Sequence, residues 1–150
     1  MAYSPQSQEI GGFAHEVLEI SRVVRVVKGG RRFRFRATVV VGDRAGKLGF
    51  GISKSKDVQQ AIQKAQAQAM KNIVTVSLVD GTISREVKAK SKGAQVLLKP
   101  ARPGTGVIAG GIIRTVADLA GIRDLVSKRY GSTNRISNAR ATIKALASIV

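Results

Sequence analysis

Basic side chains are concentrated in two stretches of the chain, where they could bind the phosphates of a polyanion. The first stretch contains no acidic residue, and its cations are Arg22, Arg25, Lys28, Arg31, Arg32, Arg34 and Arg36. The second has Glu86 as its one acid, and its cations are Arg85, Lys88, Lys90, Lys92, Lys99 and Arg102. Arginine dominates the first cluster, and a guanidinium group can bond a phosphate through two parallel hydrogen bonds or stack on a base. The two clusters therefore predict contacts to nucleic acid.

The overall charge favours this interpretation over the simpler one, in which a run of charges is only a solvated face. The 150 residues include 26 Lys and Arg but 9 Asp and Glu, which gives a net charge of +17. Solubility needs a far smaller excess, so a polyanionic partner is the stronger explanation. The aromatic residues are few, and Phe33, Phe35 and Phe50 are expected in the core. We therefore expect recognition of backbone charge and shape in structured RNA, and not stacking on single strands.

Two glycine-rich segments raise the question of nucleotide binding. The first, at residues 42–47, has three residues between its glycines where a P-loop has four. Leu48 stands where a P-loop has the Ser or Thr that binds Mg²⁺, so we reject this interpretation. The second, at residues 104–111, opens an expected helix, but hairpins precede it where a dinucleotide site needs a parallel β-α-β unit. Two alternatives stay open for its glycines: binding of a phosphate at the helix start, or close packing.

Residues for catalysis or metal binding are scarce. His15 is the only histidine and there is no cysteine, which excludes the common zinc sites and the Ser-His and Cys-His nucleophiles. We interpret His15 as a surface or partly packed residue, and we expect no enzyme activity, no metal and no cofactor. No segment approaches the about 20 apolar residues that a membrane span needs. We expect a cytoplasmic protein that binds neither a membrane nor a small-molecule substrate.

The first basic cluster lies in a domain that we expect at residues 17–73. A flexible N-terminal arm is expected before it, at residues 1–16. Two segments rich in Val and Phe, at 20–27 and 32–41, are split by a glycine turn and predict a hairpin. Side chains alternate along a strand, so one face should be core and the other cationic. The core face would carry Phe33, Phe35, Ala37, Val39 and Val41, and the cationic face Arg32, Arg34, Arg36 and Thr38.

A third strand and a helix complete this unit. The strand, at residues 47–53, contains Gly49 and Gly51, where something must approach the backbone closely or the strand must bend. From Asp57 to Ile73 the apolar residues fall at helical spacing, and Ser55 or Asp57 could cap the first turn. The sequence thus predicts a three-stranded antiparallel sheet covered by one helix.

The second unit, expected at residues 74–150, combines further strands with two helices. The strands are expected at 74–79, 82–89, 94–98 and 122–127, and the helices at 107–120 and 135–149. Asp80-Gly81 between the first two strands is typical of a type I′ hairpin. Gly121 is placed to end the first helix, and Asn134 follows Ser132 and Thr133 at the start of the second, where each could cap it. The chain as a whole is predicted to be α+β.

Several motifs in both units occur in an order that one protein family shares. In the first unit they are Gly30-Arg31, Phe35, Ala37, Val40-Val41-Gly42-Asp43, Gly46, Leu48-Gly49, Gly51, Asp57-Val58 and Ala61-Ile62. In the second they are Gly104-Thr105-Gly106-Val107-Ile108-Ala109-Gly110-Gly111 and Tyr130-Gly131-Ser132-Thr133-Asn134. The chain resembles, over residues 17–146, the bacterial-type family of small-subunit (30S) ribosomal protein number five. The resemblance implies a first domain similar to double-stranded-RNA-binding domains and a second of β-α-β type with a left-handed crossover.

The resemblance also implies partners and binding residues. The partners would be 16S rRNA near the decoding and mRNA entry region, with mRNA nearby, and small-subunit proteins number four and number eight. The expected RNA-binding residues are Arg22, Arg25, Lys28, Gly29, Gly30, Arg31, Arg32, Arg34, Lys54, Lys56, Lys88, Lys90, Lys92, Arg114, Arg129, Ser132, Thr133, Asn134 and Arg135. The expected contact with protein number four, where changes affect decoding accuracy in that family, consists of Arg102, Gly104, Thr105 and Gly106.

Two other functions stay open beside this one. A free RNA chaperone or general nucleic-acid-binding protein would use the same charge, and a nucleotide-dependent enzyme would use the second unit. One position departs from the family pattern: Arg135 follows Ser-Thr-Asn where the family usually has Pro, which adds a cation at a helix start.

Overall fold

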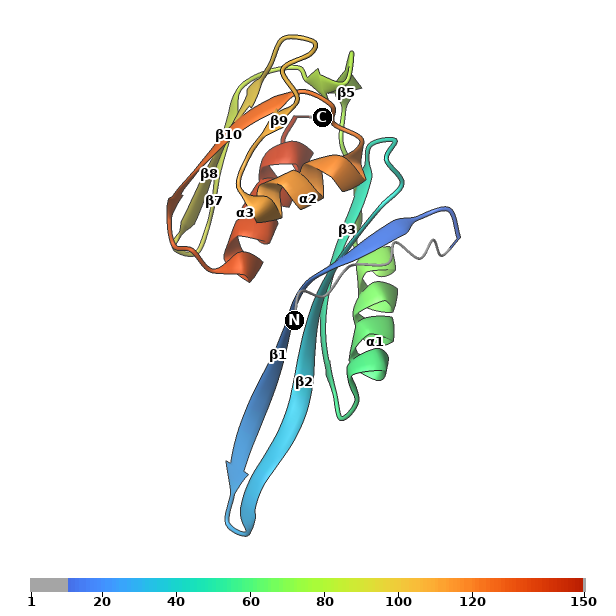
Figure 1. The fold of residues 1–150 in the computed structure, drawn as a ribbon, viewed down its shortest axis with the longest axis vertical. Coiled ribbons are helices and arrows are strands. Elements are labelled where there is room, and N and C mark those ends of the chain that lie inside the picture. Colours follow the sequence, from blue (N-terminus) through green and yellow to red (C-terminus); the bar gives the residue numbers. More distant parts are fainter. Residues whose placement is uncertain (1–10, 150) are drawn as a thin grey trace.

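The computed structural model describes residues 11–149, and Figure 1 shows two α+β halves stacked along the long axis of the molecule. The N-terminal half consists of strands β1 (Ala14–Val27), β2 (Gly30–Gly42), β3 (Lys47–Ser55) and β4 (Ile73–Thr75) and helix α1 (Val58–Lys71). The strands form one antiparallel sheet in the order β1-β2-β3-β4. The predicted hairpin, third strand and helix are confirmed. The flexible arm expected at residues 1–16 falls mostly outside the described residues, but Ala14, His15 and Glu16 already belong to β1.

Helix α1 lies directly on the backbone of the sheet. Its sheet-facing residues are Ala61, Ala65 and Ala69, all fully buried. A Cβ atom added at Gly49 would collide with the carbonyl of Ala69, and one at Gly51 with the carbonyl of Ala65. The close approach expected at these two glycines is therefore the approach of α1. The expected side-chain cap is wrong, because Asp57 makes no capping hydrogen bond and the Ser55 hydroxyl donates to Gln60 Oε1 instead.

A fourth strand, β4, extends the sheet that was expected to have three. It pairs with β3, so Val74 and Thr75 lie in the N-terminal sheet, two residues beyond the boundary expected after Ile73. The short hairpin of β5 (Leu78–Val79) and β6 (Thr82–Ile83) follows. Asp80 and Gly81 both have positive φ, as the predicted type I′ turn requires.

The C-terminal half is a mixed sheet with both helices on one face (Figure 1). Its strands are β7 (Val87–Ser91), β8 (Ala94–Pro100), β9 (Val107–Ile108) and β10 (Leu125–Gly131), in the order β7-β8-β10-β9, and its helices are α2 (Gly111–Ala120) and α3 (Arg135–Ala147). Strands β9 and β10 are parallel and α2 connects them, which confirms the β-α-β character of this half. The α+β class is likewise confirmed.

Several elements of this half differ from the prediction. The strand expected at residues 82–89 is interrupted, since β6 ends at Ile83 and β7 begins at Val87. The helix expected from residue 107 begins at Gly111, because residues 107–108 pair with β10 and form β9. The strand expected at residues 122–127 is β10, shifted to Leu125–Gly131, because residues 122–124 leave α2 through the left-handed Gly121. The predicted helix end at Gly121 is confirmed, and so is the cap of α3, where Asn134 Oδ1 accepts a hydrogen bond from the Ile136 amide at 3.0 Å.

The two halves share one hydrophobic core. Val40 and Leu48 of the N-terminal sheet belong to the same buried cluster as Val116, Leu125 and Leu146. The turn between β2 and β3 is bonded to the end of α2, since the Arg44 amide donates to Leu119 O and the Gly46 amide to Ala120 O, each at 3.0 Å. This contact corrects part of the predicted cationic face, because Thr38, which was expected there, is fully buried beneath the C-terminal half.

Candidate nucleic-acid interface

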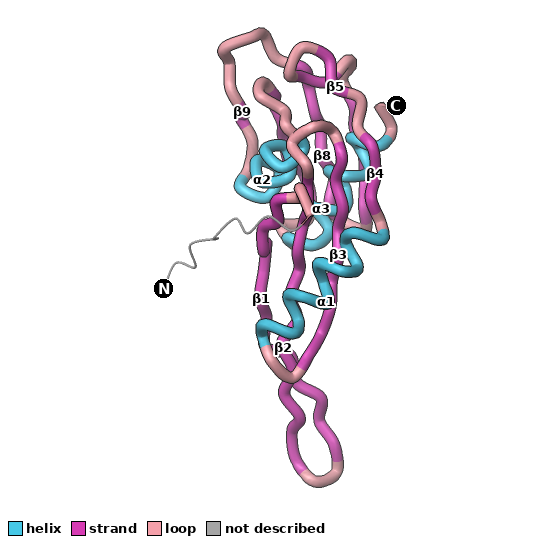
Figure 2. Tube along the Cα trace, turned by 90° about the vertical axis from the view of Figure 1, so that its right-hand side faces the viewer, coloured by secondary structure: helices cyan, strands magenta, loops and turns pink. Residues whose placement is uncertain are grey.

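The β1–β2 hairpin extends well beyond the end of α1 as a two-stranded ribbon (Figures 1 and 2). Its turn is Lys28-Gly29, and Gly30, with φ of 137°, begins the return strand. All the candidate residues that the sequence placed on this hairpin are exposed: Arg22, Arg25, Lys28, Gly29, Gly30, Arg31, Arg32 and Arg34. The structure therefore brings the first basic cluster together on one projection.

One face of the hairpin is cationic, and we call it the hairpin surface; it consists of Arg25, Arg32, Arg34, Arg36 and Lys54. The β1–β2 register places Arg25 opposite Arg32 and Val23 opposite Arg34, and the β2–β3 register places Arg36 opposite Lys54. Residues directly opposite in antiparallel strands share a face, so these cations project to the same side. The candidate Lys54 thus joins the first cluster although it lies far from it in the sequence.

The other face of the hairpin is apolar and open to solvent, and this corrects the expectation for Phe33. Ile20, Val24, Val26 and Phe33 are all exposed, Phe33 by 43%. They share the face of Ala37, which α1 covers, but α1 does not reach as far as the outer hairpin. The Arg22 guanidinium lies 3.9 Å from the centroid of the Phe33 ring.

A second cationic area, the sheet surface, lies on the face of the C-terminal sheet away from its helices; it consists of Lys88, Lys90, Lys99, Lys128 and Tyr130. The strand register aligns Lys88 with Leu97 and Lys128, and Lys90 with Gln95 and Tyr130. Lys88 Nζ lies 5.9 Å from the centroid of the Tyr130 ring, and Tyr130 is 44% exposed. Sequence reasoning missed Lys128 and Tyr130, which alternation along β10 would have found had that strand been placed at residues 125–131.

A hollow of about 400 Å³ lies where β1 meets the starts of α2 and α3. Three of the expected RNA-binding residues line it: Arg129, Thr133 and Arg135. Arg129 is exposed, and Arg135 Nη1 donates to Leu18 O at 3.2 Å. Glu16 also lines it. Burial raises the pKa of the Glu16 carboxyl above its usual range, the Asp118 carboxylate raises it further, and a hydrogen bond from Thr115 lowers it.

The glycines of the segment at residues 104–111 are not held by close packing. A Cβ atom at Gly104, Gly106, Gly110 or Gly111 would meet no heavy atom within 4 Å. Gly104 and Gly106 are instead needed for their positive φ, and the Gly106 amide donates to the buried Asp124 carboxylate at 2.8 Å. The packing alternative is therefore wrong for these four positions, and Asp124, which a dinucleotide site would direct at a ribose, binds the chain's own backbone.

The remaining candidates lie apart from the two cationic surfaces. Lys56 is exposed just before α1, Lys92 occupies the β7–β8 turn, and Arg114 is exposed on α2. Ser132 and Asn134 use their side-chain oxygens to bond the backbone at the start of α3. The expected protein contact, Arg102, Gly104, Thr105 and Gly106, forms a loop before β9 in which Thr105 bonds Arg102 O.

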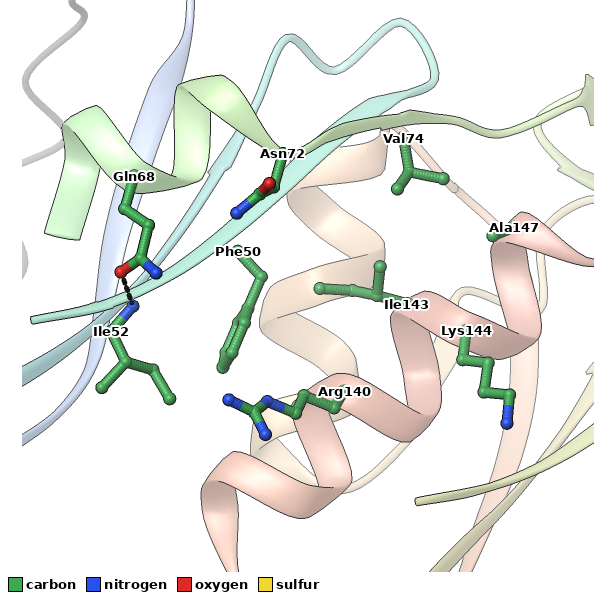
Figure 3. A pocket seen from close by; sticks show the side chains of 9 residues that line it. All are labelled: Phe50, Ile52, Gln68, Asn72, Val74, Arg140, Ile143, Lys144 and Ala147. Atoms are coloured by element: carbon green, nitrogen blue, oxygen red, sulfur yellow. Dashed lines mark hydrogen bonds between the residues drawn. The ribbon is translucent and has the colours of Figure 1, made fainter.

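The pocket in Figure 3 lies between α3 and the end of α1 and contains none of the candidates. Its volume is about 390 Å³, Phe50 lies at its centre, and the Arg140 guanidinium is 5.5 Å from the centroid of that ring. Gln68 Oε1 accepts a hydrogen bond from the Ile52 amide at 3.1 Å across its rim. No Asp, Glu, His, Ser, Thr or Tyr lines it, and its ionisable side chains are Arg140 and Lys144. His15, expected near the arm, is instead buried within β1.

Within residues 11–149, no group of three or more His, Asp or Glu side chains is placed to hold a metal ion. In the same range, none of the helices has the length and apolar character needed to cross a membrane.

Comparison with known proteins identifies relatives along nearly the whole chain. Residues 13–77 match the family described as ribosomal protein S5, N-terminal domain, and residues 89–150 match ribosomal protein S5, C-terminal domain. The small ribosomal subunit protein uS5 of Chromohalobacter salexigens is 49% identical over 142 residues, which cover 95% of this chain and 86% of the relative. The protein of the same name from Campylobacter jejuni is 52% identical over 134 residues, which cover 89% and 91% of the two chains.

Proposed function

The chain belongs to the ribosomal protein S5 family, and from that premise we propose that it binds 16S rRNA as a structural component of the small ribosomal subunit. Its place would be near the decoding and mRNA entry region of the cytoplasmic ribosome, where it supports translational accuracy. The protein is not an enzyme, since the family is a structural one. Binding and positioning of RNA is therefore the activity to explain.

The observation that carries the proposal is that, apart from Lys99, the cations of the two cationic surfaces form no ion pair within residues 11–149. Among the Lys and Arg residues at positions 11–149, only Lys99 lies within 4 Å of a carboxylate, that of Glu86 at 3.7 Å. The cations of the hairpin surface therefore repel one another across strands, and no acid among residues 11–149 forms an ion pair with them. Phosphates would remove that repulsion, and the release of their counterions would supply binding free energy.

Two neighbouring proteins complete the proposal. The exposed loop of Arg102, Gly104, Thr105 and Gly106 is our candidate contact for small-subunit protein number four, and the region of α3 for protein number eight. The loop suits this role because its backbone is held by Thr105 and Asp124, which leaves Arg102 free to contact a partner.

The test measures the salt dependence of binding to a 16S rRNA fragment. The double variant Arg25→Ala/Arg32→Ala removes two facing cations of the hairpin surface. Each lost phosphate contact should reduce the slope of log affinity against log salt by about 0.9. Between 50 and 200 mM salt, the affinity of the parent should therefore fall about tenfold more than the affinity of the double variant.

The matched control is Lys47→Ala/Lys64→Ala, which removes the same charge from exposed positions outside both surfaces. It should leave the slope within about 0.3 of the parent. Equal slopes for the two double variants would refute the assignment of the hairpin surface. A protein that washes off 30S particles at high salt and binds unrelated RNAs as tightly would instead be a free RNA chaperone.

A further inference from the structure

The open apolar face of the β1–β2 hairpin is not explained by phosphate binding. Val24 is 48% exposed, Val26 76% and Phe33 43%, and Val24 lies directly opposite Phe33 in the β1–β2 register. Arg31 is opposite Val26, so it borders the same face near the tip. A ribbon with cations on one face and large apolar side chains on the other has more than backbone charge to offer a partner.

Phe33 and Arg22 form an exposed aromatic platform on this face, beside the half-buried Phe35 that lies opposite Arg22. The guanidinium already lies over the ring at 3.9 Å from its centroid, and both residues remain exposed. Bases stack both on aromatic rings and on guanidinium planes. A planar, uncharged group can therefore stack on the open side of the ring or of the guanidinium, with Val24 along its edge.

The charge around this platform has a single sign. From Ser21 to Arg36 every charged residue is a cation, so a ligand that places a planar apolar group on Phe33 must carry negative charge next to it. A nucleotide has that combination, because its base and its phosphate are separated by one sugar. In a fully paired duplex, however, the base faces are stacked on one another and are not available to Phe33.

We propose that the apolar face of the hairpin holds an unpaired RNA base, which stacks on the Phe33–Arg22 pair while Arg22 and Arg31 contact its flanking phosphates. The proposal rests on the RNA-binding function above and adds to it a preference for RNA with an unstacked nucleotide. The hairpin surface on the other side of the ribbon would contact phosphates of the neighbouring strand. The hairpin thus reads one structural feature of the RNA, and not charge alone.

The experiment compares two RNA stem-loops that differ by one bulged nucleotide, 2-aminopurine, which fluoresces less when it is stacked. The full-length chain should bind the bulged stem-loop at least fivefold more tightly than the paired one and quench the fluorescence. Phe33→Ala should lose about fivefold or more on the bulged RNA and nothing on the paired one, with the salt slope unchanged. Phe33→Trp should restore both affinity and quenching.

Two controls separate stacking from other effects. Val79→Ala shortens an exposed apolar side chain on the β5–β6 hairpin and should change neither affinity. Arg25→Ala should weaken binding of both stem-loops equally, since it removes only a phosphate contact. Circular dichroism checks that Phe33→Ala folds, as expected for a residue beyond the reach of α1.

The outcomes distinguish this proposal from the function on which it rests. A parent that binds both stem-loops equally, or a Phe33→Ala variant that weakens both to the same extent, overturns the base site and leaves RNA binding intact. A parent that binds neither overturns both. If Phe33→Ala loses binding to phosphatidylglycerol vesicles while its RNA affinities stay at the parent level, the face is a lipid contact and the proposal is wrong.

Discussion

Substitution of Gly51 by alanine should destabilise the protein more than any other single methyl group added to the sheet beneath α1. A Cβ atom at this position would lie 2.7 Å from the Ala69 nitrogen and 3.0 Å from the Ala65 carbonyl carbon, and closer still to the Ala65 oxygen. All three are backbone atoms, so no side-chain rotation can relieve the contact. Either α1 moves away from β3 or the strand bends.

The magnitude follows from how α1 is held. Its buried residues are three alanines, which contact the sheet only because the helix lies so close to it. A displacement of about 1 Å opens voids beside all three, and overpacking of this kind typically costs 1–3 kcal/mol. We expect the upper end, about 3 kcal/mol, which lowers the melting temperature of a chain of this size by roughly 6–12 °C.

Urea unfolding followed by circular dichroism gives the free energy directly. The matched control is Gly111→Ala, where the added Cβ meets nothing within 4 Å and φ is helical, so it should stabilise α2 by about 0.5 kcal/mol. The two variants should therefore change stability in opposite directions. A Gly51→Ala protein within 0.5 kcal/mol of the parent would refute the reasoning, since a helix that can retreat without cost is not fixed by its alanines.

Three further outcomes are expected. Asn134→Ala should lower the free energy of unfolding by about 1 kcal/mol through loss of the cap on the Ile136 amide, while Thr133→Ala, beside it, should not; thermal melts check this. Because the pKa of Glu16 is raised in the fold, the native state holds that proton more tightly than the unfolded chain, so ionised Glu16 destabilises the protein above about pH 4.5. Glu16→Gln should thus raise stability at pH 7 and not below about pH 4, and an unchanged difference between the two pH values would contradict the assignment. Deletion of residues 28–31 should leave the melting temperature nearly unchanged but weaken RNA binding, whereas global unfolding would mean that the turn is structural.

Most elements set by local residues were predictable from the sequence, although the cap expected at Ser55 or Asp57 does not form. Glycine at the turn after Lys28, the Asp80-Gly81 pair and the Asn134 cap each act through their own backbone or the next few residues, and each is where it was expected. Gly49 and Gly51 also indicated a close approach to the backbone of β3, which α1 makes.

What the sequence did not predict depends on distant pairing or coverage. Residues 107–108 suit the apolar face of a helix, and they form a strand only because β10 lies beside them. Phe33 was assigned to the correct face of its strand, but that face is exposed there because α1 begins level with the end of β3 and leaves the outer hairpin uncovered, which no local pattern encodes. Lys128 and Tyr130 were missed because of strand pairing as well, since the face on which they lie depends on where β10 begins.

The hydrophobic core common to both halves has a mechanical consequence. With Val40 and Leu48 packed among Val116 and Leu146, and the β2–β3 turn bonded to α2, no hinge separates the hairpin from the C-terminal sheet. The distance between the hairpin and the C-terminal sheet is then fixed, and under the proposed function RNA segments bound at these two places would be held at the separation that the fold imposes. Under that proposal the protein would select one arrangement from the ensemble of a flexible RNA, without changing its own shape.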